Sequence, residues 1–193
     1  MRKWTLLCCV LVSVFAGCTS TAPTVIYTGS VTDPQGDVIT QGGAVPVPAD
    51  MISAKLDVVG TDLVITVTFA PGTLSHADSQ WQVNLDTDDN PATGVIDEPT
   101  IGIDFIVRAV FPRGSTTAEI VKVVNNTFPV VGTATVSYPT NDSAKVTVPL
   151  SKLGDDEGKL SFKFTTAHWL NDTGGSSVLD TMPNVGLPVG TVR

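Results

Sequence analysis

The chain has little cysteine, few aromatic residues and few basic side chains. All three cysteines lie within the first 18 of 193 residues, aromatic residues make up 6% of the sequence, and 11 Lys and Arg stand against 19 Asp and Glu. A disulfide framework is therefore excluded beyond residue 18. The excess of acid argues against nucleic acid and anionic lipid headgroups as partners, and it is compatible with bound divalent cations.

The sequence also lacks an apolar run long enough to cross a bilayer. The run at residues 6–16 follows Arg2 and Lys3 and leads into Phe15-Ala16-Gly17-Cys18. A positive start, a short apolar stretch and small residues before a cysteine are typical of an export signal. The last four residues resemble a bacterial lipobox, with Phe15 in the place of the usual Leu.

We therefore predict a lipoprotein signal peptide over residues 1–17, cut before Cys18, which then carries the lipid. The alternative is a plain secretory signal with an incidental cysteine. The lipid would anchor the protein to a membrane of a bacterial cell envelope. In a cell with two membranes, Thr19 after the cysteine resembles proteins sent to the outer membrane. Loss of Arg2 and Lys3 leaves nine basic residues against 19 acidic ones, a net charge of −10.

The mature chain predicts a single domain behind a short tether. It has 176 residues once the first 17 of 193 are removed, enough for one domain with a sizeable core. Thr, Ser, Gly and Pro dominate its beginning, with little apolar periodicity. We expect a lipidated tether over residues 18–31 and one β-sandwich domain over residues 32–193.

Apolar residues alternate with polar residues along most of the domain, which is the pattern of β-strands with one buried face. The clearest runs are at residues 52–58, 63–69, 81–85 and 101–109, and further strands are expected near 118–124, 133–138, 144–149 and 159–168. No long amphipathic helix is expected. The predicted fold is all-β, an antiparallel jelly-roll-like β-sandwich of eight or more strands.

Oxygen-bearing side chains gather where the strand at 81–85 ends. Asp86, Asp88 and Asn90 stand at alternate positions, and Asp104 lies on the polar face of the next predicted strand. Such a spacing lets oxygens converge on a hard cation as the backbone turns, which predicts a structural Ca²⁺ site. The alternative is an Asx-rich turn whose side chains cap backbone amides.

A second acidic group lies near the start of the domain. Asp33 and Asp37 are separated by a Pro-Gln-Gly turn, and Asp50 follows further along the chain. Asp180 would join these three if the two ends of the domain meet. This group is a second possible metal site, with ordinary turn chemistry as the alternative.

These motifs together resemble the DOMON-like domains of bacterial secreted proteins, relatives of family 9 carbohydrate-binding modules. The resemblance rests on Asp33-Pro34-Gln35-Gly36-Asp37, Asp50-Met51-Ile52, Leu85-Asp86-Thr87-Asp88 with Asn90-Pro91-Ala92-Thr93-Gly94, and Ile101-Gly102-Ile103-Asp104-Phe105. It implies a jelly-roll-like sandwich, a structural calcium ion in some members, and sugar or haem binding in others. The fold alone does not fix the ligand.

Two tryptophans bear on a ligand role. Trp81 shares the parity of Val83 and Leu85, which predicts a core position, whereas Trp169 has the outward parity and is the candidate sugar platform. No nucleophile or zinc-protease motif is present, so we expect no enzyme. The expected function is a binding module, with carbohydrate as the leading ligand. The alternative is an envelope-structural or protein-interaction lipoprotein.

Overall fold

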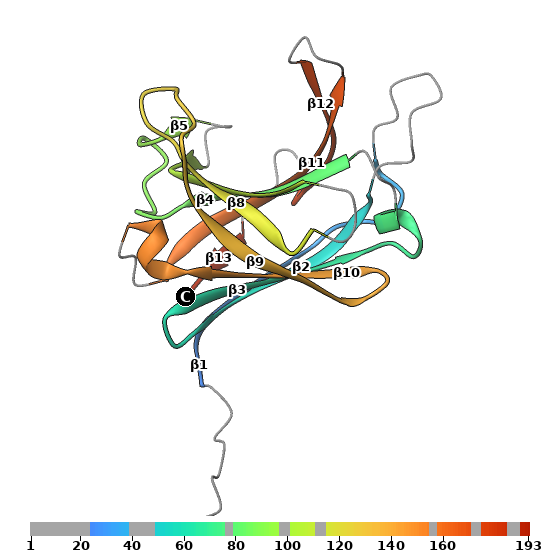
Figure 1. The fold of residues 1–193 in the computed structure, drawn as a ribbon, viewed down its shortest axis with the longest axis horizontal. Coiled ribbons are helices and arrows are strands. Elements are labelled where there is room, and N and C mark those ends of the chain that lie inside the picture. Colours follow the sequence, from blue (N-terminus) through green and yellow to red (C-terminus); the bar gives the residue numbers. More distant parts are fainter. Residues whose placement is uncertain are drawn as a thin grey trace, which may run out of the picture.

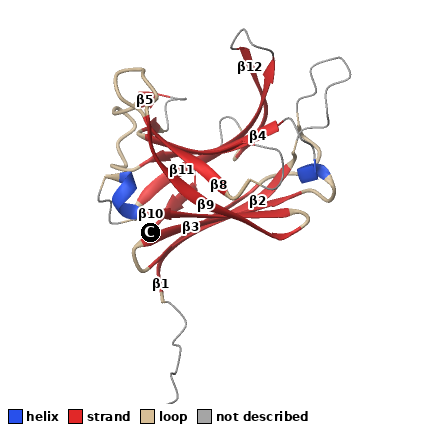
Figure 2. Cartoon of the chain, viewed as in Figure 1, coloured by secondary structure: helices blue, strands red, loops and turns tan. Residues whose placement is uncertain are grey.

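The computed structural model describes residues 24–38, 49–75, 79–96, 101–110, 115–154, 158–170, 175–184 and 190–193. The order of the elements is β1 (Val25–Thr32), β2 (Met51–Val59), β3 (Asp62–Phe69), η1 (Thr73–Ser75), β4 (Ser79–Asp86), β5 (Val95–Ile96), β6 (Gly102–Ile103), β7 (Phe105–Val110), β8 (Thr117–Lys122), β9 (Val130–Thr140), β10 (Ser143–Pro149), η2 (Leu150–Leu153), β11 (Leu160–Leu170), β12 (Gly175–Met182) and β13 (Gly190–Val192). The elements η1 and η2 are short 3₁₀ helices (Figure 2).

Strict alternation of apolar and polar residues builds the strands. In β3 every second side chain, beginning at Leu63, is buried, and the side chains between them are half-buried. The hairpin from β2 to β3 turns at Gly60, whose φ of 61° suits a residue without a Cβ. The prediction of an all-β, antiparallel fold with eight or more strands is confirmed.

The main sheet is continuous and antiparallel, in the order β1-β2-β3-β10-β9-β8-β7-β4-β11-β12, with β13 pairing β11. It curls on itself so that one layer faces the other (Figure 1). Its last strand, β13, nearly closes the curl against β1, where the amide of Thr28 donates to the carbonyl of Arg193 at 3.3 Å. Strands β5 and β6 form a separate two-stranded sheet.

Strand β1 was not expected from the sequence. It occupies residues 25–32, most of which fall in the range assigned to the tether, and its residues from Tyr27 onward pair in register with β2. Its side chains are mostly exposed, and Gly29 is buried because the backbone of β13 crosses there. A Cβ on Gly29 would lie 2.1 Å from the carbonyl oxygen of Thr191.

Both layers contribute to one hydrophobic core. Trp81 is fully buried, as predicted, and meets Phe69 edge to face with ring centroids 6.3 Å apart. The partly buried Tyr27 and the fully buried Val192 are the first and last hydrophobic residues at this core. All the core residues that the structure describes therefore lie from Tyr27 onward. Within the described ranges, no helix has the length and apolar character needed to span a membrane.

Candidate metal centre

Four carboxylates meet at one end of the curled sheet, and we call them the Asp33 cluster (Asp33, Asp37, Asp50 and Asp180). Three separate segments supply them: the turn after β1, the residue before β2, and β12. Asp33, Asp37 and Asp180 each offer an oxygen, and these oxygens lie within 4.8 Å of one another. The two ends of the domain therefore meet here, as the sequence analysis required for this group.

Hydrogen bonds fix the backbone around the Asp33 cluster. The amide of Met51 donates to Asp180 Oδ2 at 2.8 Å, and the amide of Gly36 donates to Asp50 Oδ2 at 2.8 Å. The Asn184 side-chain amide donates to Asp37 Oδ2 at 2.8 Å. These bonds join the turn after β1, the start of β2 and the end of β12 around the cluster.

Part of the cluster is buried without a hydrogen-bond partner. Asp33 is 9% exposed and Asp50 is 4% exposed. Both oxygens of Asp33 and Oδ1 of Asp50 are buried and have no well-aligned hydrogen bond from the described residues, although the backbone amide of Asn184 lies near Asp33. Within this part of the chain, no Lys or Arg pairs with any of the four carboxylates. A buried ionised carboxylate without a donor or counter-charge is strongly unfavourable.

Burial and mutual repulsion raise two pKa values in the cluster. Burial raises the pKa of Asp33 to about 7, and the charges of Asp37, Asp180 and Asp50 add to the rise, which the nearby amide of Asn184 only partly offsets. Burial also raises the pKa of Asp180 to about 6, against the amides of Met51 and Thr181 that lower it. A divalent cation would offset both the burial and the mutual repulsion, and so would stabilise the ionised carboxylates.

Strand register explains why Asp180 belongs to this site. Asp180 pairs with Thr166 of β11 and has the parity of the core residue Met182, so its carboxylate lies inside the end of the curl. Thr166 is fully buried, and its hydroxyl has no partner among the described residues. The sequence analysis missed Thr166, which strand pairing brings to Asp180, and Asn184, whose side chain reaches Asp37 only through the tertiary fold.

The loop after β4 carries the other predicted group, here the Asp86 cluster (Asp86, Asp88, Asn90 and Asp104). Asp86, Asp88 and Asp104 offer oxygens within 4.8 Å of one another. Burial raises the pKa of Asp86, and Asp104 and Asp88 add to the rise, while the amides of Gly102 and Asn90 lower it. The structure thus brings these carboxylates together as predicted.

Protein donors reach each carboxylate of the Asp86 cluster. Asp86 accepts from the amides of Asn90 at 3.1 Å and Gly102 at 3.2 Å. Asp88 accepts from the Thr93 hydroxyl at 2.9 Å, and Asp104 accepts from the amide of Thr87 at 3.0 Å. This is the hydrogen bonding of an Asx-rich turn. These donors stabilise the ionised carboxylates, so the Asp86 cluster depends less on a bound cation than the Asp33 cluster does.

Asp89 links this loop to the end of the chain. Its φ of 54° turns the backbone, and its carboxylate accepts from the Ser161 hydroxyl at 2.8 Å and from Arg193 Nη2 at 2.7 Å. The Ser161 hydroxyl and then Arg193 lower the pKa of Asp89 against the opposing effect of its burial. Asp89 is therefore a structural link rather than a metal ligand.

Two predicted site residues lie outside what the structure describes. Cys18 falls before the first described residue, and the side chain of Trp169 is likewise not described, although its backbone pairs with Ser176.

Comparison with known proteins found no match to any protein-family model and no match among curated proteins. The DOMON-like resemblance therefore stays a prediction.

Proposed function

We propose that this chain is a lipid-tethered protein of a bacterial cell envelope whose all-β domain binds calcium at the Asp33 cluster and acts as a binding module, not an enzyme. One observation carries the proposal: Asp33 is buried, its oxygens lie close to those of Asp37 and Asp180, and only the backbone amide of Asn184 lies near enough to lower its pKa, while neither oxygen has a well-aligned hydrogen bond from a described residue. A divalent cation supplies the missing charge and the missing partner together.

Calcium fits this donor set better than magnesium does. Calcium accepts a variable number of carboxylate oxygens in flexible geometry, whereas magnesium demands a near-ideal octahedron and keeps several waters. In the Asp33 cluster, Asp33, Asp37 and Asp180 offer oxygens within 4.8 Å of one another, with Asp50 nearby, and all but the exposed Asp37 are buried. The ion would therefore stabilise the fold by joining segments that are remote in the sequence.

The ligand of the module is the second part of the proposal. Carbohydrate is the leading candidate, with Trp169 as the platform, and a protein partner is the alternative.

A jelly-roll-like arrangement of the strands is also part of the proposal. It is supported by two crossovers, β3 to β10 and β4 to β11, that bring distant strands side by side as Greek-key connections do.

Calcium titration of thermal unfolding tests the metal site on the chain from Thr24 onward. At about a hundredfold excess over its Kd, a ligand selective for the folded state adds about 2.7 kcal/mol of stability. We expect calcium to raise the midpoint of the natural domain and chelator to lower it again. Asp33→Asn should lose most of the rise, because Asn cannot neutralise the ion.

Asp88→Asn is the matched control, since it changes the same residue type in the cluster whose carboxylates already have donors. It should keep most of the calcium-induced rise. The Asp33 cluster would be rejected as the metal centre if calcium left the natural midpoint unchanged, or if Asp88→Asn rather than Asp33→Asn abolished the rise.

A further inference from the structure

Buried polar atoms without a well-aligned hydrogen bond gather at one end of the curled sheet. Among the described residues they belong to Asp33, Asp50, Trp81 and Thr166. The two acids are members of the Asp33 cluster, and Asp180 of the same cluster lies opposite Thr166 in the strand register. Unpartnered buried polar atoms are few in folded proteins, and each costs free energy. Their gathering here indicates that one polar ligand serves all of them.

A closed circuit of contacts places Trp81 and Thr166 beside the Asp33 cluster. Thr166 of β11 pairs with Trp81 of β4 on one side and with Asp180 of β12 on the other. The amide of Met51 donates to Asp180 at 2.8 Å. Met51 also pairs with Phe69, whose ring meets that of Trp81 edge to face. These five residues therefore surround one region between the two layers.

Thr166 places its hydroxyl on the inner face of the sheet. It has the parity of the core residues Phe162 and Phe164, and its side chain is fully buried. Directly opposed residues of an antiparallel pair have Cβ atoms about 4.5–5.5 Å apart on the same face. The hydroxyl nevertheless has no hydrogen bond to Asp180, whose two oxygens accept from backbone amides. A water is the group that can join the hydroxyl to an ion held by Asp180.

A water molecule matches the donors and acceptors of this region. A buried water needs about two to four polar partners. The Thr166 hydroxyl can accept one of its protons, the indole N–H of Trp81 can donate to its oxygen, and a cation can bind that oxygen as well. Calcium regularly keeps waters among its ligands. The unpartnered atoms thus suit an ion that retains part of its hydration shell.

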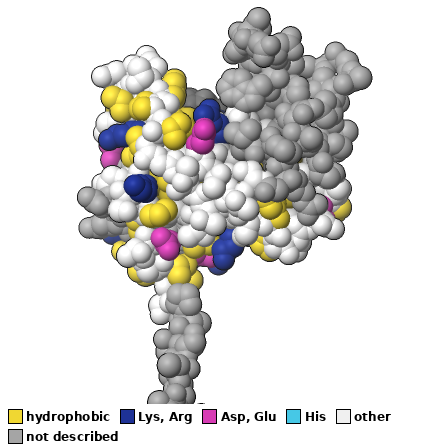
Figure 3. All heavy atoms as spheres, viewed as in Figure 1, with side chains coloured by type: hydrophobic (Ala, Val, Ile, Leu, Met, Phe, Trp, Pro, Cys, Tyr) yellow, Lys and Arg dark blue, Asp and Glu magenta, His cyan; other side chains and the backbone are white. Residues whose placement is uncertain are grey.

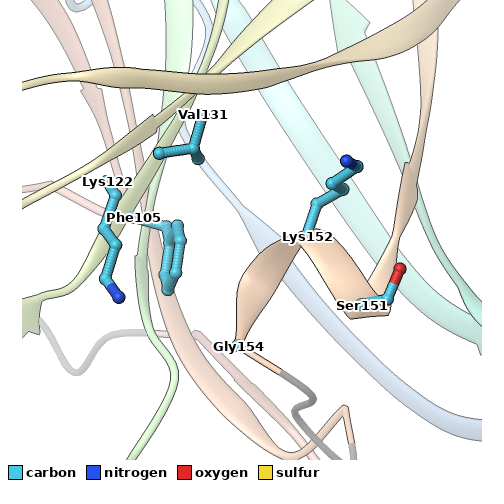
Figure 4. A pocket seen from close by; sticks show the side chains of 6 residues that line it. All are labelled: Phe105, Lys122, Val131, Ser151, Lys152 and Gly154. Atoms are coloured by element: carbon cyan, nitrogen blue, oxygen red, sulfur yellow. The ribbon is translucent and has the colours of Figure 1, made fainter.

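Two views of the described surface show side chains that do not converge in this way. On the face shown in Figure 3, Asp and Glu side chains are scattered among other residues. A hollow opens beside Phe105, but the ammonium groups of Lys122 and Lys152 point apart on its opposite sides (Figure 4). The described residues that line this hollow carry no unpartnered buried side-chain atom. The convergence of polar groups is a feature of the interior.

We propose that Thr166 is a further residue of the calcium site, and that its hydroxyl binds the ion of the Asp33 cluster through one water molecule. This inference rests on the proposed function, because it adds a residue to the same site. No acidic motif marks this residue. Removal of the hydroxyl should therefore weaken calcium binding without destabilising the calcium-free domain.

Thr166→Val tests this role, because Val keeps the branched Cβ that suits a strand and lacks the hydroxyl. Calorimetric titration of the full chain in detergent measures calcium affinity, and the binding heat that Asp33→Asn removes belongs to the Asp33 cluster. We expect Thr166→Val to raise the Kd of that cluster about two- to tenfold, the effect of losing one hydrogen bond.

Thermal unfolding in chelator gives a second readout for Thr166→Val. The midpoint should stay equal or rise, because a buried hydroxyl without a partner is removed. A lower midpoint would mean that the hydroxyl already has a protein partner, which contradicts the inference.

Two further variants separate the hydroxyl from packing. Thr166→Ser keeps a hydroxyl and should bind calcium as the natural chain does, although the lost methyl group lowers its unfolding midpoint. Thr147→Val makes the same change as the test variant at a half-buried position of β10 that pairs with Val64. It should leave the Kd unchanged.

Failure of this inference differs from failure of the metal site. If calcium binds the natural chain and Thr166→Val with equal affinity, the Asp33 cluster stands and Thr166 is removed from it. If Thr166→Ser weakens binding as much as Thr166→Val does, packing explains the effect and the inference is again overturned. If calcium does not bind the natural chain, both proposals are overturned.

Discussion

At the scale of single residues, Asp33 has the most unusual environment in the described structure. A carboxylate normally stays at the surface or accepts several hydrogen bonds when it is buried. Asp33 does neither, and three further carboxylates surround it. An acid in this position must bind a cation or a proton to be tolerated, so ion binding and protonation compete at the same oxygens.

This competition predicts how stability depends on pH in the absence of calcium. Burial raises the pKa of Asp33 to about 7 and that of Asp180 to about 6 in the folded state, well above the ordinary value of an Asp side chain. At a pH between the ordinary pKa of Asp, about 4, and these raised values, the folded state holds protons that the unfolded chain has lost. The free energy of unfolding must then fall as the pH rises from about 4 to about 7.

Thermal unfolding in chelator at a series of pH values measures this slope. Asp33→Asn should flatten it, because the group with the larger shift is gone, and saturating calcium should abolish it, because the ion replaces the proton. A calcium-free domain whose midpoint rises with pH over this range would contradict the environment assigned to Asp33.

The sequence predicted the members of both acidic clusters but could not show which cluster is the better metal site. Alternate Asx residues after a strand indicate converging oxygens, and Asp86, Asp88 and Asp104 do converge. Whether those oxygens already have donors depends on where the amides of Gly102 and Thr87 lie in space. The sequence pointed first to the Asp86 cluster as the metal site, whereas burial and the scarcity of donors favour the Asp33 cluster.

At the scale of elements, alternation predicted the central strands and missed those at the ends of the chain. Strands β2, β3 and β10 have regular apolar faces that a one-sided core demands. In strand β1 the apolar residues at 25–27 stand next to one another and only Gly29 is buried, so its sequence gives no alternation to detect. It forms because β2 and β13 offer it hydrogen-bond partners.

The contact between β1 and β13 gives a prediction for Gly29. Any Cβ at this position meets the backbone carbonyl of Thr191 at 2.1 Å, and backbone cannot rotate away as a side chain can. Gly29→Ala should displace β13 from β1 and destabilise the domain by about 1–3 kcal/mol, the usual cost of overpacking. Denaturant unfolding measures the change.

Gly132→Ala is the control, since Gly132 also lies within a strand and an added Cβ would meet only the flexible side chains of Lys152 and Ile120 at 3.4 Å or more. It should be neutral or stabilising. Equal effects of the two substitutions would mean that β13 does not press on β1 as the structure places it.

At the scale of the whole molecule, the proposed lipid and the domain have separate roles. Every described core residue lies in the chain from Thr24 onward, so we expect the domain to fold without the anchor. The proposed tether before β1 would fix the domain to a membrane. The net negative charge of the protein would keep the surface of the domain from adhering to anionic lipid.

Cys18→Ser tests this arrangement in cells. The natural chain should fractionate with membranes and extract with detergent, whereas the variant should be recovered in the soluble fraction with the same calcium-dependent midpoint. Membrane association that persists in the variant would remove Cys18 as the anchoring residue.

The sequence by itself determined the β class of this protein, the parity of its core residues and the identity of its acidic groups, because alternation and residue type are local properties. Only the tertiary structure decided which acids lack partners. Asp33 and Asp180 are remote in the chain, and the curling of one sheet until it nearly closes brings them together. Burial and hydrogen bonding depend on that closure, which no local pattern encodes.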